Sequence, residues 1–172
     1  MYKSVLDYFE ETVKRVPEKK AIRHNEDDCT FAMLQEQAQK LGSYMIELVG
    51  DIKNRPIVVL LPKSMDGFVA DLGISYSCNI FNNLDVKTPV HRLENIIKLL
   101  KPVMVITNNA YKDMLSWQEY DVKLLNLDET VLCDININAE ELEKRRKELI
   151  DTDPFCIINT SGSTGTPKGV VL

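Results

Sequence analysis

The sequence predicts an α/β protein in which a parallel β-sheet is flanked by helices. Three short apolar runs, at 57–61, 103–106 and 122–127, have the length and composition of strands that are buried in a sheet. Segments with apolar residues at helical spacing separate these runs. Strands that alternate with helices favour βαβ units, whose right-handed crossovers produce a parallel sheet.

A helix, a β-hairpin and a second helix are expected before the first buried strand. The first helix ends at Pro17, and its predicted apolar stripe consists of Val5, Phe9, Val13 and Val16, widened by Tyr8 and Thr12. We interpret this stripe as packing on the protein's own core, although such a helix could also bind a membrane or a partner. Two short strands, 21–24 and 29–31, follow around a polar turn. The second helix takes Thr30 as its N-cap.

The later elements repeat the alternation of strand and helix. A helix over 65–76 leads to a strand at 80–84, and Thr88 with Pro89 supplies a cap and a proline at the start of the next helix. The segment 128–138 is expected to be a surface connection.

The last predicted helix, 140–149, is strongly charged. Its pairs Glu140–Lys144 and Glu141–Arg145 stand four residues apart, which predicts a self-neutralised solvent face rather than a basic patch for nucleic acid.

Length and composition are those of one ordinary globular domain, with 172 residues of which 44% are hydrophobic. The formal net charge of -5 argues against a nucleic-acid or anionic-membrane partner. No apolar run approaches the ~18 residues of a membrane span, and the N-terminus carries acids where a signal peptide has its apolar core. The sequence therefore predicts a cytoplasmic protein. Its four cysteines and two histidines lack metal-ligand spacing, so we expect buried, reduced thiols and no metal site.

A run rich in glycine and hydroxyl residues, T-S-G-S-T-G-T-P-K-G, occupies 160–169. It follows the apolar segment 155–158, which predicts one more buried strand. Glycines let a backbone approach a ligand closely, its N–H groups and the hydroxyls can donate to an anion, and a lysine adds positive charge. These are the ingredients of a polyphosphate site, whereas the alternative is a plain polar turn. The run is not a Walker loop, because Pro167 replaces its last glycine, and it lacks the glycine spacing of a Rossmann loop. Residues 170–172 begin another strand, so the loop is expected to join two strands without a following helix.

This run resembles the phosphate-loop signature T-S-G-[ST]-T-G-x-P-K-G of the adenylate-forming enzymes, and every fixed position is met. That superfamily includes acyl-CoA synthetases, luciferases and peptide-synthetase adenylation domains. Upstream, residues 30–34 resemble its T-[YF]-x-x-L motif. Residues 81–93 resemble Y-x-P-L-D-x-x-x-P-x-x-R-[LI], a pattern typical of amino-acid adenylation domains such as D-alanine–carrier protein ligases. Three departures are Asn83, where proline is usual, the segment 77–79, where a small, glycine-rich stretch is usual, and Asn159, where an aromatic residue is common.

The resemblance implies part of the large N-terminal domain of an ATP-dependent ligase. Such enzymes use ATP and magnesium to convert a carboxylate, here an amino acid by preference, into an acyl-adenylate. The adenylate then passes to a thiol of a phosphopantetheine carrier protein or of CoA. The implied phosphate-binding residues are Thr160, Ser161, Gly162, Ser163, Thr164, Gly165, Lys168 and Gly169. None of them transfers a proton, so the resemblance implies no catalytic and no metal-binding residue in this chain.

The family's remaining site residues lie downstream of the loop. Residues 1–172 are therefore expected to be the N-terminal portion of an adenylation domain, truncated just after the phosphate loop and inactive alone. Alternatives are a fatty-acyl or aryl-CoA/AMP ligase, a carrier-charging enzyme split over two chains, and a non-catalytic phosphate-binding or interaction module. Whether the reading frame continues past Leu172, or a second frame supplies the rest, would discriminate among them.

Overall fold

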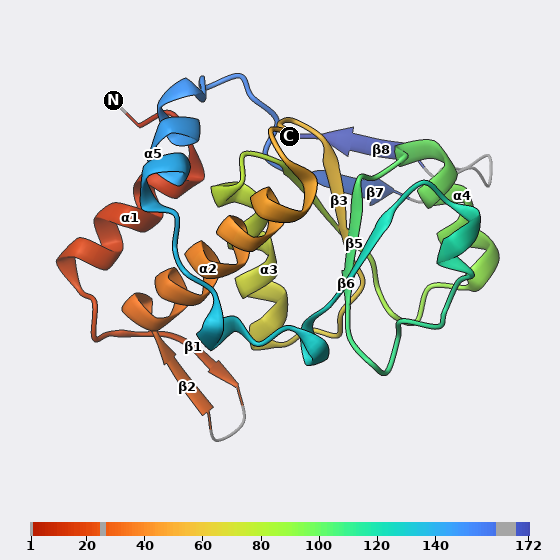
Figure 1. The fold of residues 1–172 in the computed structure, drawn as a ribbon, viewed down its shortest axis with the longest axis horizontal. Coiled ribbons are helices and arrows are strands. Elements are labelled where there is room, and N and C mark those ends of the chain that lie inside the picture. The colour runs from red at the N-terminus through yellow and green to blue at the C-terminus, as the bar shows by residue number, and fades with distance from the viewer. Residues whose placement is uncertain (1, 25–26, 161–167) are drawn as a thin grey trace.

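A four-stranded parallel sheet forms the centre of the protein, as the computed structural model shows over the residues that it describes, 2–24, 27–160 and 168–172 (Figure 1). Its strands are β3 (Pro56–Val59), β4 (Ile80–Asn83), β5 (Met104–Thr107) and β6 (Lys123–Asn126). They are hydrogen-bonded in the order β4-β3-β5-β6, and all three pairings are parallel. The predicted fold class is confirmed, and each of the four strands lies where the sequence predicts it.

Helices cover both faces of this sheet (Figure 1). α2 (Phe31–Val49) and α3 (Met65–Tyr76) lie on one face, and α4 (Val90–Leu100) lies on the other. The connection from β3 to β4 and the connection from β4 to β5 run in opposite directions across the sheet. Right-handed crossovers therefore place α3 and α4 on opposite faces.

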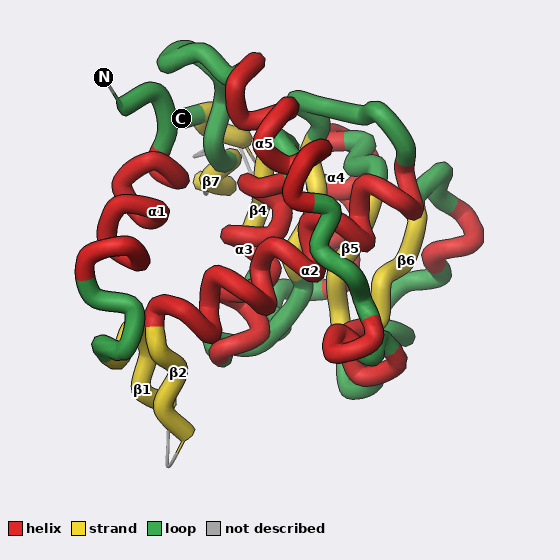
Figure 2. Tube along the Cα trace, turned by 60° about the vertical axis from the view of Figure 1, so that its left-hand side comes forward, coloured by secondary structure: helices red, strands yellow, loops and turns green. Residues whose placement is uncertain are grey.

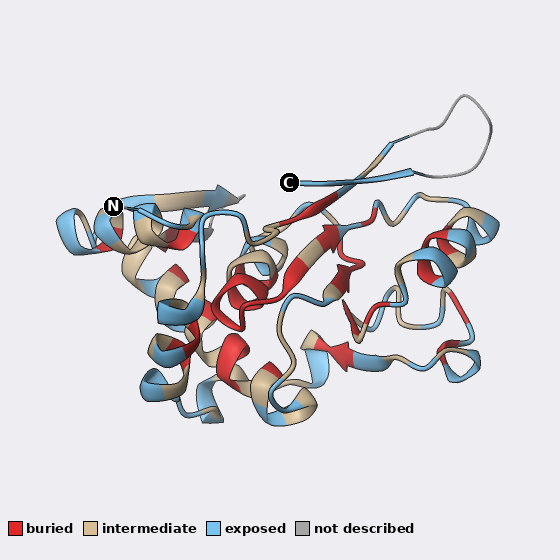
Figure 3. Cartoon of the chain, turned by 90° about the horizontal axis from the view of Figure 1, so that it is seen from above, coloured by how far each residue is buried: buried red, intermediate tan, exposed pale blue. Residues whose placement is uncertain are grey.

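The central strands are largely buried (Figure 3), and their side chains belong to two cores. Alternate residues of a strand point to opposite faces, so one strand serves both layers. Facing α2 and α3 are Ile57, Val59, Met104 and Ile106. Facing α4 are Val58, Leu60 and Val105. The uninterrupted apolar runs in the sequence arise because both faces of the sheet are covered.

An outer layer packs on α2 and α3, on the side away from the sheet (Figure 2). It contains α1 (Val5–Arg15) and α5 (Ala139–Glu148), and α2 is preceded by the antiparallel hairpin of β1 (Lys20–His24) and β2 (Asp27–Thr30). The predicted N-cap of α2 is confirmed, because the Thr30 hydroxyl accepts a hydrogen bond from the backbone N–H of Met33 at 3.2 Å. None of the described helices is long and apolar enough to cross a membrane.

The predicted stripe of α1 is wrong in part. Its buried residues are Leu6 and Val13, whereas Val5 and Tyr8 are exposed. The inward face is therefore rotated toward Leu6, which the spacing argument overlooked. Leu6 packs in a cluster with Ala38 of α2 and Tyr76 of α3.

The predicted cap of α4 is also wrong. The N-cap residue is Pro89 and makes no side-chain cap. Thr88 instead closes a turn, in which its backbone N–H donates to the carbonyl oxygen of Asp85 at 2.8 Å. Asp85, the acid of the 81–93 motif, therefore lies at the start of that turn.

Between β5 and α5 the chain forms short 3₁₀ turns, η1 (Trp117–Glu119), η2 (Leu127–Glu129) and η3 (Leu132–Asp134). The last two lie in the segment predicted to be a surface connection, which is confirmed. After α5 come β7 (Ile157–Thr160) and β8 (Lys168–Val171), which pair with each other in an antiparallel hairpin. This hairpin projects from the body of the molecule, and most of its residues are exposed (Figure 3). The prediction of a buried strand at 155–158 is therefore wrong in part, because Ile157 is buried whereas Ile158 is exposed.

Candidate functional site

The two ends of the glycine-rich loop meet at the tip of the β7–β8 hairpin. Thr160 lies opposite Lys168 in the ladder, and the Thr160 hydroxyl donates to the carbonyl oxygen of Lys168 at 3.3 Å. Both residues are exposed. The prediction that the loop joins two strands is confirmed, since a strand rather than a helix follows it. The structure therefore brings a hydroxyl and an ammonium group to the same end of one hairpin.

Most of the predicted phosphate-binding residues fall outside the described part of the chain. These are Ser161, Gly162, Ser163, Thr164 and Gly165. Their assignment stays a prediction, as do the roles of Thr160 and Lys168.

Gly169 is needed for space rather than for an unusual backbone angle. A β-carbon at this position would lie 3.0 Å from Cγ2 of Ile157, closer than packed atoms allow without movement. Among the described glycines, positive φ occurs at Gly50 and not at Gly169. The described backbone at Gly169 therefore does not need a glycine for its φ angle, and the assignment of Gly169 to phosphate binding stays a prediction. Its role there is to let β8 lie close to β7.

β7 reaches the main sheet beside its edge strand β4. Phe81 and Cys156 form an isolated parallel bridge, and the rings of Phe81 and Phe155 meet edge to face with centroids 4.8 Å apart. Next to this bridge, the amide of Asn82 donates to the carbonyl oxygen of Ile157 at 2.6 Å. The amide of Asn159 in turn donates to the side-chain oxygen of Asn82 at 2.9 Å. The base of the loop is thus attached to β4 through side chains.

A groove of about 590 Å³ lies along this junction. Its polar lining comes from Asn83, Asp85, Lys87, Thr88, Arg92 and Asn159. The groove is therefore shared by two segments that are far apart in the sequence. One is the 81–93 motif at the end of β4, and the other is the segment 156–159 that leads into the loop. Asp85 is exposed and accepts from the backbone N–H of Lys87 at 2.9 Å, which holds the turn between β4 and α4.

A second cavity, of about 770 Å³, lies at the carboxyl ends of β3 and β4. Phe68, Asp71 and Asn83 line it together with lysines from both connecting loops. One carboxylate oxygen of Asp71 accepts from the Asn83 amide at 2.9 Å, while the other oxygen is buried without a partner. Burial raises the pKa of the Asp71 carboxyl to about 6, and the Asn83 hydrogen bond opposes that shift.

Asp71 and Asn82 were missed by the sequence reasoning. The available signal was the Asn82-Asn83 pair at the end of an otherwise apolar strand, where polar side chains need partners. The partners of Asn82 lie about 75 residues away, so the pattern could not name them.

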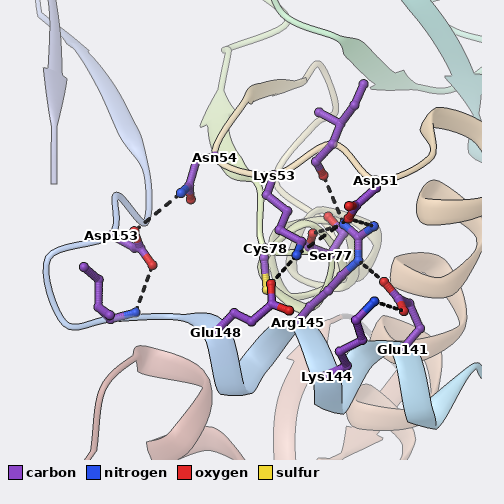
Figure 4. A network of polar contacts seen from close by, with 12 residues as sticks. Asp51, Lys53, Asn54, Ser77, Cys78, Glu141, Lys144, Arg145, Glu148 and Asp153 are labelled. Carbon is purple, nitrogen blue, oxygen red and sulfur yellow. Dashed lines mark hydrogen bonds and ion pairs between the residues drawn. The ribbon is translucent and has the colours of Figure 1, made fainter.

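Arg145 anchors the helix that precedes the hairpin (Figure 4). Its guanidinium is 1% exposed and donates to the carbonyl oxygens of Gly50, Ile52 and Ser77. It also pairs with Glu141 at 2.8 Å and with Asp51 at 3.1 Å. The predicted Glu141–Arg145 pair is confirmed, but the prediction that it lies on a solvent face is wrong. Nε donates to Glu141 on the same helix, whereas the two terminal nitrogens donate to the segment 50–52 after α2 and to Ser77 at the end of α3. The single ammonium group of a lysine could not reach all of these acceptors.

The second pair predicted on α5 differs too. Lys144 contacts Glu141 at 3.4 Å, three residues away. Lys53 pairs with Glu148 at the far end of the helix, so polar contacts fasten α5 along its length (Figure 4).

Three of the four thiols are buried, as expected, whereas Cys133 is exposed. Burial raises the pKa of the Cys78 thiol to about 11. Within the described residues, no group of three His, Cys, Asp or Glu side chains is arranged to hold a metal ion.

Comparison with known proteins identifies the family. A family model described as AMP-binding enzyme matches residues 9–172, and the chain belongs to this family. The resemblance inferred from the loop is thereby confirmed.

The relatives are ligases and peptide synthetases. The chain is 28% identical over 179 residues to a D-alanine--D-alanyl carrier protein ligase of Listeria welshimeri, which covers 100% of this chain and 33% of that protein. It is 28% identical over 170 residues to gramicidin S synthase 2 of Brevibacillus brevis, which covers 99% of this chain and 4% of the synthase. The chain thus spans about a third of the length of the ligase and far less of the synthase.

Solved structures share the fold. VinN superposes with a TM-score of 0.79 at 22% identity, over 99% of this chain and 46% of VinN. The N-terminal subdomain of Klebsiella oxytoca NpsA gives a TM-score of 0.75 at 18% identity, over 99% of this chain and 41% of that chain.

Proposed function

We propose that this chain is the N-terminal portion of an ATP-dependent ligase that activates a carboxylate as an acyl-adenylate and transfers it to a thiol. The single observation that carries the proposal is the complete T-S-G-S-T-G-T-P-K-G run, within a family match that covers residues 9–172. Its ends, Thr160 and Lys168, are paired at the exposed tip of a hairpin. A hydroxyl donor and a cation at one point fit the phosphates of ATP.

In this proposal the loop holds the β- and γ-phosphates while charge builds on the departing pyrophosphate. Lys168 provides fixed positive charge, and the hydroxyls of Thr160, Ser161, Ser163 and Thr164 donate hydrogen bonds. Groups that are already oriented stabilise such charge without having to reorganise. Gly162, Gly165 and Gly169 keep the backbone uncrowded. No residue of this chain is given a proton-transfer role.

ATP and magnesium are the proposed cofactors. Magnesium would share the charge of the phosphates. We assign it no ligand among the described residues, because they contain no suitable cluster of carboxylates. The need for ATP, together with thiols that are mostly buried, supports a cytoplasmic protein.

An amino acid is the favoured substrate, and a carrier-protein phosphopantetheine is favoured over CoA as the thiol. Both choices rest on the 81–93 motif and on relatives that are a carrier protein ligase and peptide synthetases. A fatty-acyl or aryl-CoA/AMP ligase is the alternative, because Asn83 and Asn159 depart from the amino-acid pattern.

The test is substrate-dependent exchange of labelled pyrophosphate into ATP, over a panel of amino, fatty and aryl acids. It compares the 172-residue chain with the product of the complete reading frame. We expect exchange from the latter with amino acids and none from the 172 residues alone, because the resemblance implies that the residues that orient the carboxylate lie downstream of the loop. Failure of the complete product with every acid would favour a non-catalytic module.

Lys168→Ala in the complete product should lower the exchange rate roughly 30- to 1,000-fold. This corresponds to about 2–4 kcal/mol for one lost group that stabilises charge in the transition state. Lys147→Ala is the matched control, since its side chain on α5 is 73% exposed. Equal rates for Lys168→Ala and wild type would remove the lysine from the proposed site.

A further inference from the structure

β7 is not a regular fifth strand of the central sheet. Its ladder is made with β8, through four residue pairs from Ile157–Val171 to Thr160–Lys168. Toward β4, the described backbone forms one isolated bridge, Phe81–Cys156. Backbone pairing therefore ends one residue before β7 begins.

The side chain of Asn82 continues the attachment beyond that bridge. Asn82 is fully buried, and its amide makes one contact in each direction, donating to Ile157 and accepting from Asn159. A carboxamide carries both N–H donors and a carbonyl acceptor, which are the two functions of a backbone peptide group. Asn82 thus adds two further hydrogen bonds between β4 and β7 where the backbones themselves do not pair.

Apolar packing alone does not explain the two amides at this junction. A buried amide is stabilising only when its polar atoms are satisfied, and the Asn159 oxygen is buried without a partner. Apolar side chains at 82 and 159 would leave no buried polar atom without a partner. Polar pairs of this kind fix one relative placement of two elements, because any shift breaks their hydrogen bonds.

We propose that Asn82 is a positioning residue, which fixes β7 against β4 and thereby sets the place of the Thr160–Lys168 pair. Asn159 is the last residue before Thr160, and it lies opposite Gly169 in the ladder. The hydrogen bonds of Asn82 therefore end directly beside the two residues proposed to hold phosphate. The functional part of this inference rests on the proposed phosphate site, whereas the attachment itself does not.

Asn82→Asp and Asn82→Leu test the attachment in the 172-residue chain. The aspartate keeps the shape and removes the donor to Ile157. The leucine removes both hydrogen bonds without burying a charge, so it serves if the aspartate variant fails to fold. Asn79→Asp is the matched control, because Asn79 is buried as well, at 4% exposed, and its amide donates to Ile52 and Ser77 rather than to β7.

The primary readout is amide hydrogen exchange of residues 156–160 and 168–172, measured by mass spectrometry. We expect at least a tenfold acceleration there in the Asn82 variants, with β3 and β5 unchanged, and no such local effect in Asn79→Asp. Unchanged exchange in the hairpin of a folded Asn82 variant would overturn the proposal.

The second readout is the dissociation constant for inorganic pyrophosphate, measured by calorimetry. We expect it to rise at least tenfold in the Asn82 variants and to stay constant in Asn79→Asp. Faster exchange with unchanged pyrophosphate affinity would reduce Asn82 to a structural residue and overturn the positioning role. A wild-type chain that binds no pyrophosphate would contradict the proposed phosphate site, while hydrogen exchange would still decide whether Asn82 fixes β7.

Discussion

Arg145 belongs to the strongly charged helix α5. Even so, it is the largest fully buried side chain among the described residues. Its guanidinium satisfies carbonyl oxygens at the end of α2, in the segment before β3 and at the end of α3. Carbonyl groups at helix ends lack partners within the helix, so an external donor is required when the end is buried. A single side chain thereby joins three segments to α5.

Replacing Arg145 should lower the free energy of unfolding more than replacing any other charged residue of α5. We expect Arg145→Met to lower the free energy of unfolding by roughly 3–5 kcal/mol, because the carbonyl oxygens would stay buried without donors. Lys144→Ala, one residue away and largely exposed, should change it by no more than about 0.5 kcal/mol. Urea unfolding of both variants measures the difference. Similar free energies of unfolding would contradict the proposed role of Arg145 in joining these segments to α5.

Asp71 makes stability depend on pH. Its folded-state pKa of about 6 lies above the ~3.9 of an unfolded aspartate, so the folded chain binds this proton more tightly. The stabilisation is complete below about pH 4 and is lost as the pH rises through about 6.

The difference in free energy of unfolding between Asp71→Asn and wild type should therefore shift by about 1–2 kcal/mol in favour of the variant as the pH rises from 4 to 7. Asp66→Asn, which removes an exposed carboxylate from the same helix, controls for the loss of one negative charge. Urea unfolding at several pH values measures the gain. A pH-independent difference between Asp71→Asn and wild type would show that the carboxyl is not perturbed in the folded chain.

At the scale of elements, α2 and α3 approach each other through glycines. A β-carbon on Gly42 would lie 3.0 Å from the carbonyl oxygen of Gly73, and one on Gly73 would lie 3.2 Å from that of Ala38. The two helices can pack this closely only because neither position carries a side chain. Their contact fixes the layer against which β3 and β5 pack.

Gly42→Ala should destabilise the protein by about 1–3 kcal/mol, because overpacking outweighs the better helix propensity of alanine. Gly67→Ala is the opposite case on α3, since the nearest atom to its added carbon would be 3.8 Å away. That substitution should be stabilising by about 0.5–1 kcal/mol. Thermal unfolding of the pair checks both signs, and a stabilised Gly42→Ala variant would contradict the close packing.

At the scale of the whole molecule, burial is concentrated in the central strands and absent from the hairpin tip. All residues of β5 are buried, whereas every residue of β8 is exposed. Amides that open only on global unfolding exchange slowest, and those in exposed elements with few contacts exchange fastest.

Native-state hydrogen exchange should therefore rank β3 and β5 slowest and β8 fastest among the strands. Their rates should differ by several powers of ten, because the slow amides report global stability and the fast ones local opening. Peptide-resolved mass spectrometry provides the measurement. Protection of β8 equal to that of β5 in a monomeric sample would contradict the order.

Local pattern was sufficient for the elements and for the loop. Three apolar runs and the alternation of strands with helices located the four sheet strands, and Thr30 was identified as a cap from its position alone. The loop motif identified the family that the whole-chain comparison confirms. It could not show how the loop is held, because the partners of Asn82 are 75 and 77 residues distant.

The sequence by itself determined the alternation of strands and helices, the two-sided burial of the sheet and the phosphate-loop signature. These depend on periodicity and on neighbours within a few residues, where the backbone geometry is known in advance. Only the tertiary structure decided that Leu6 rather than Val5 faces inward, that Arg145 is buried, and that Asn82 meets β7. The reason is physical: the side chain that satisfies a buried polar group is chosen by packing between distant segments, and no local spacing encodes it.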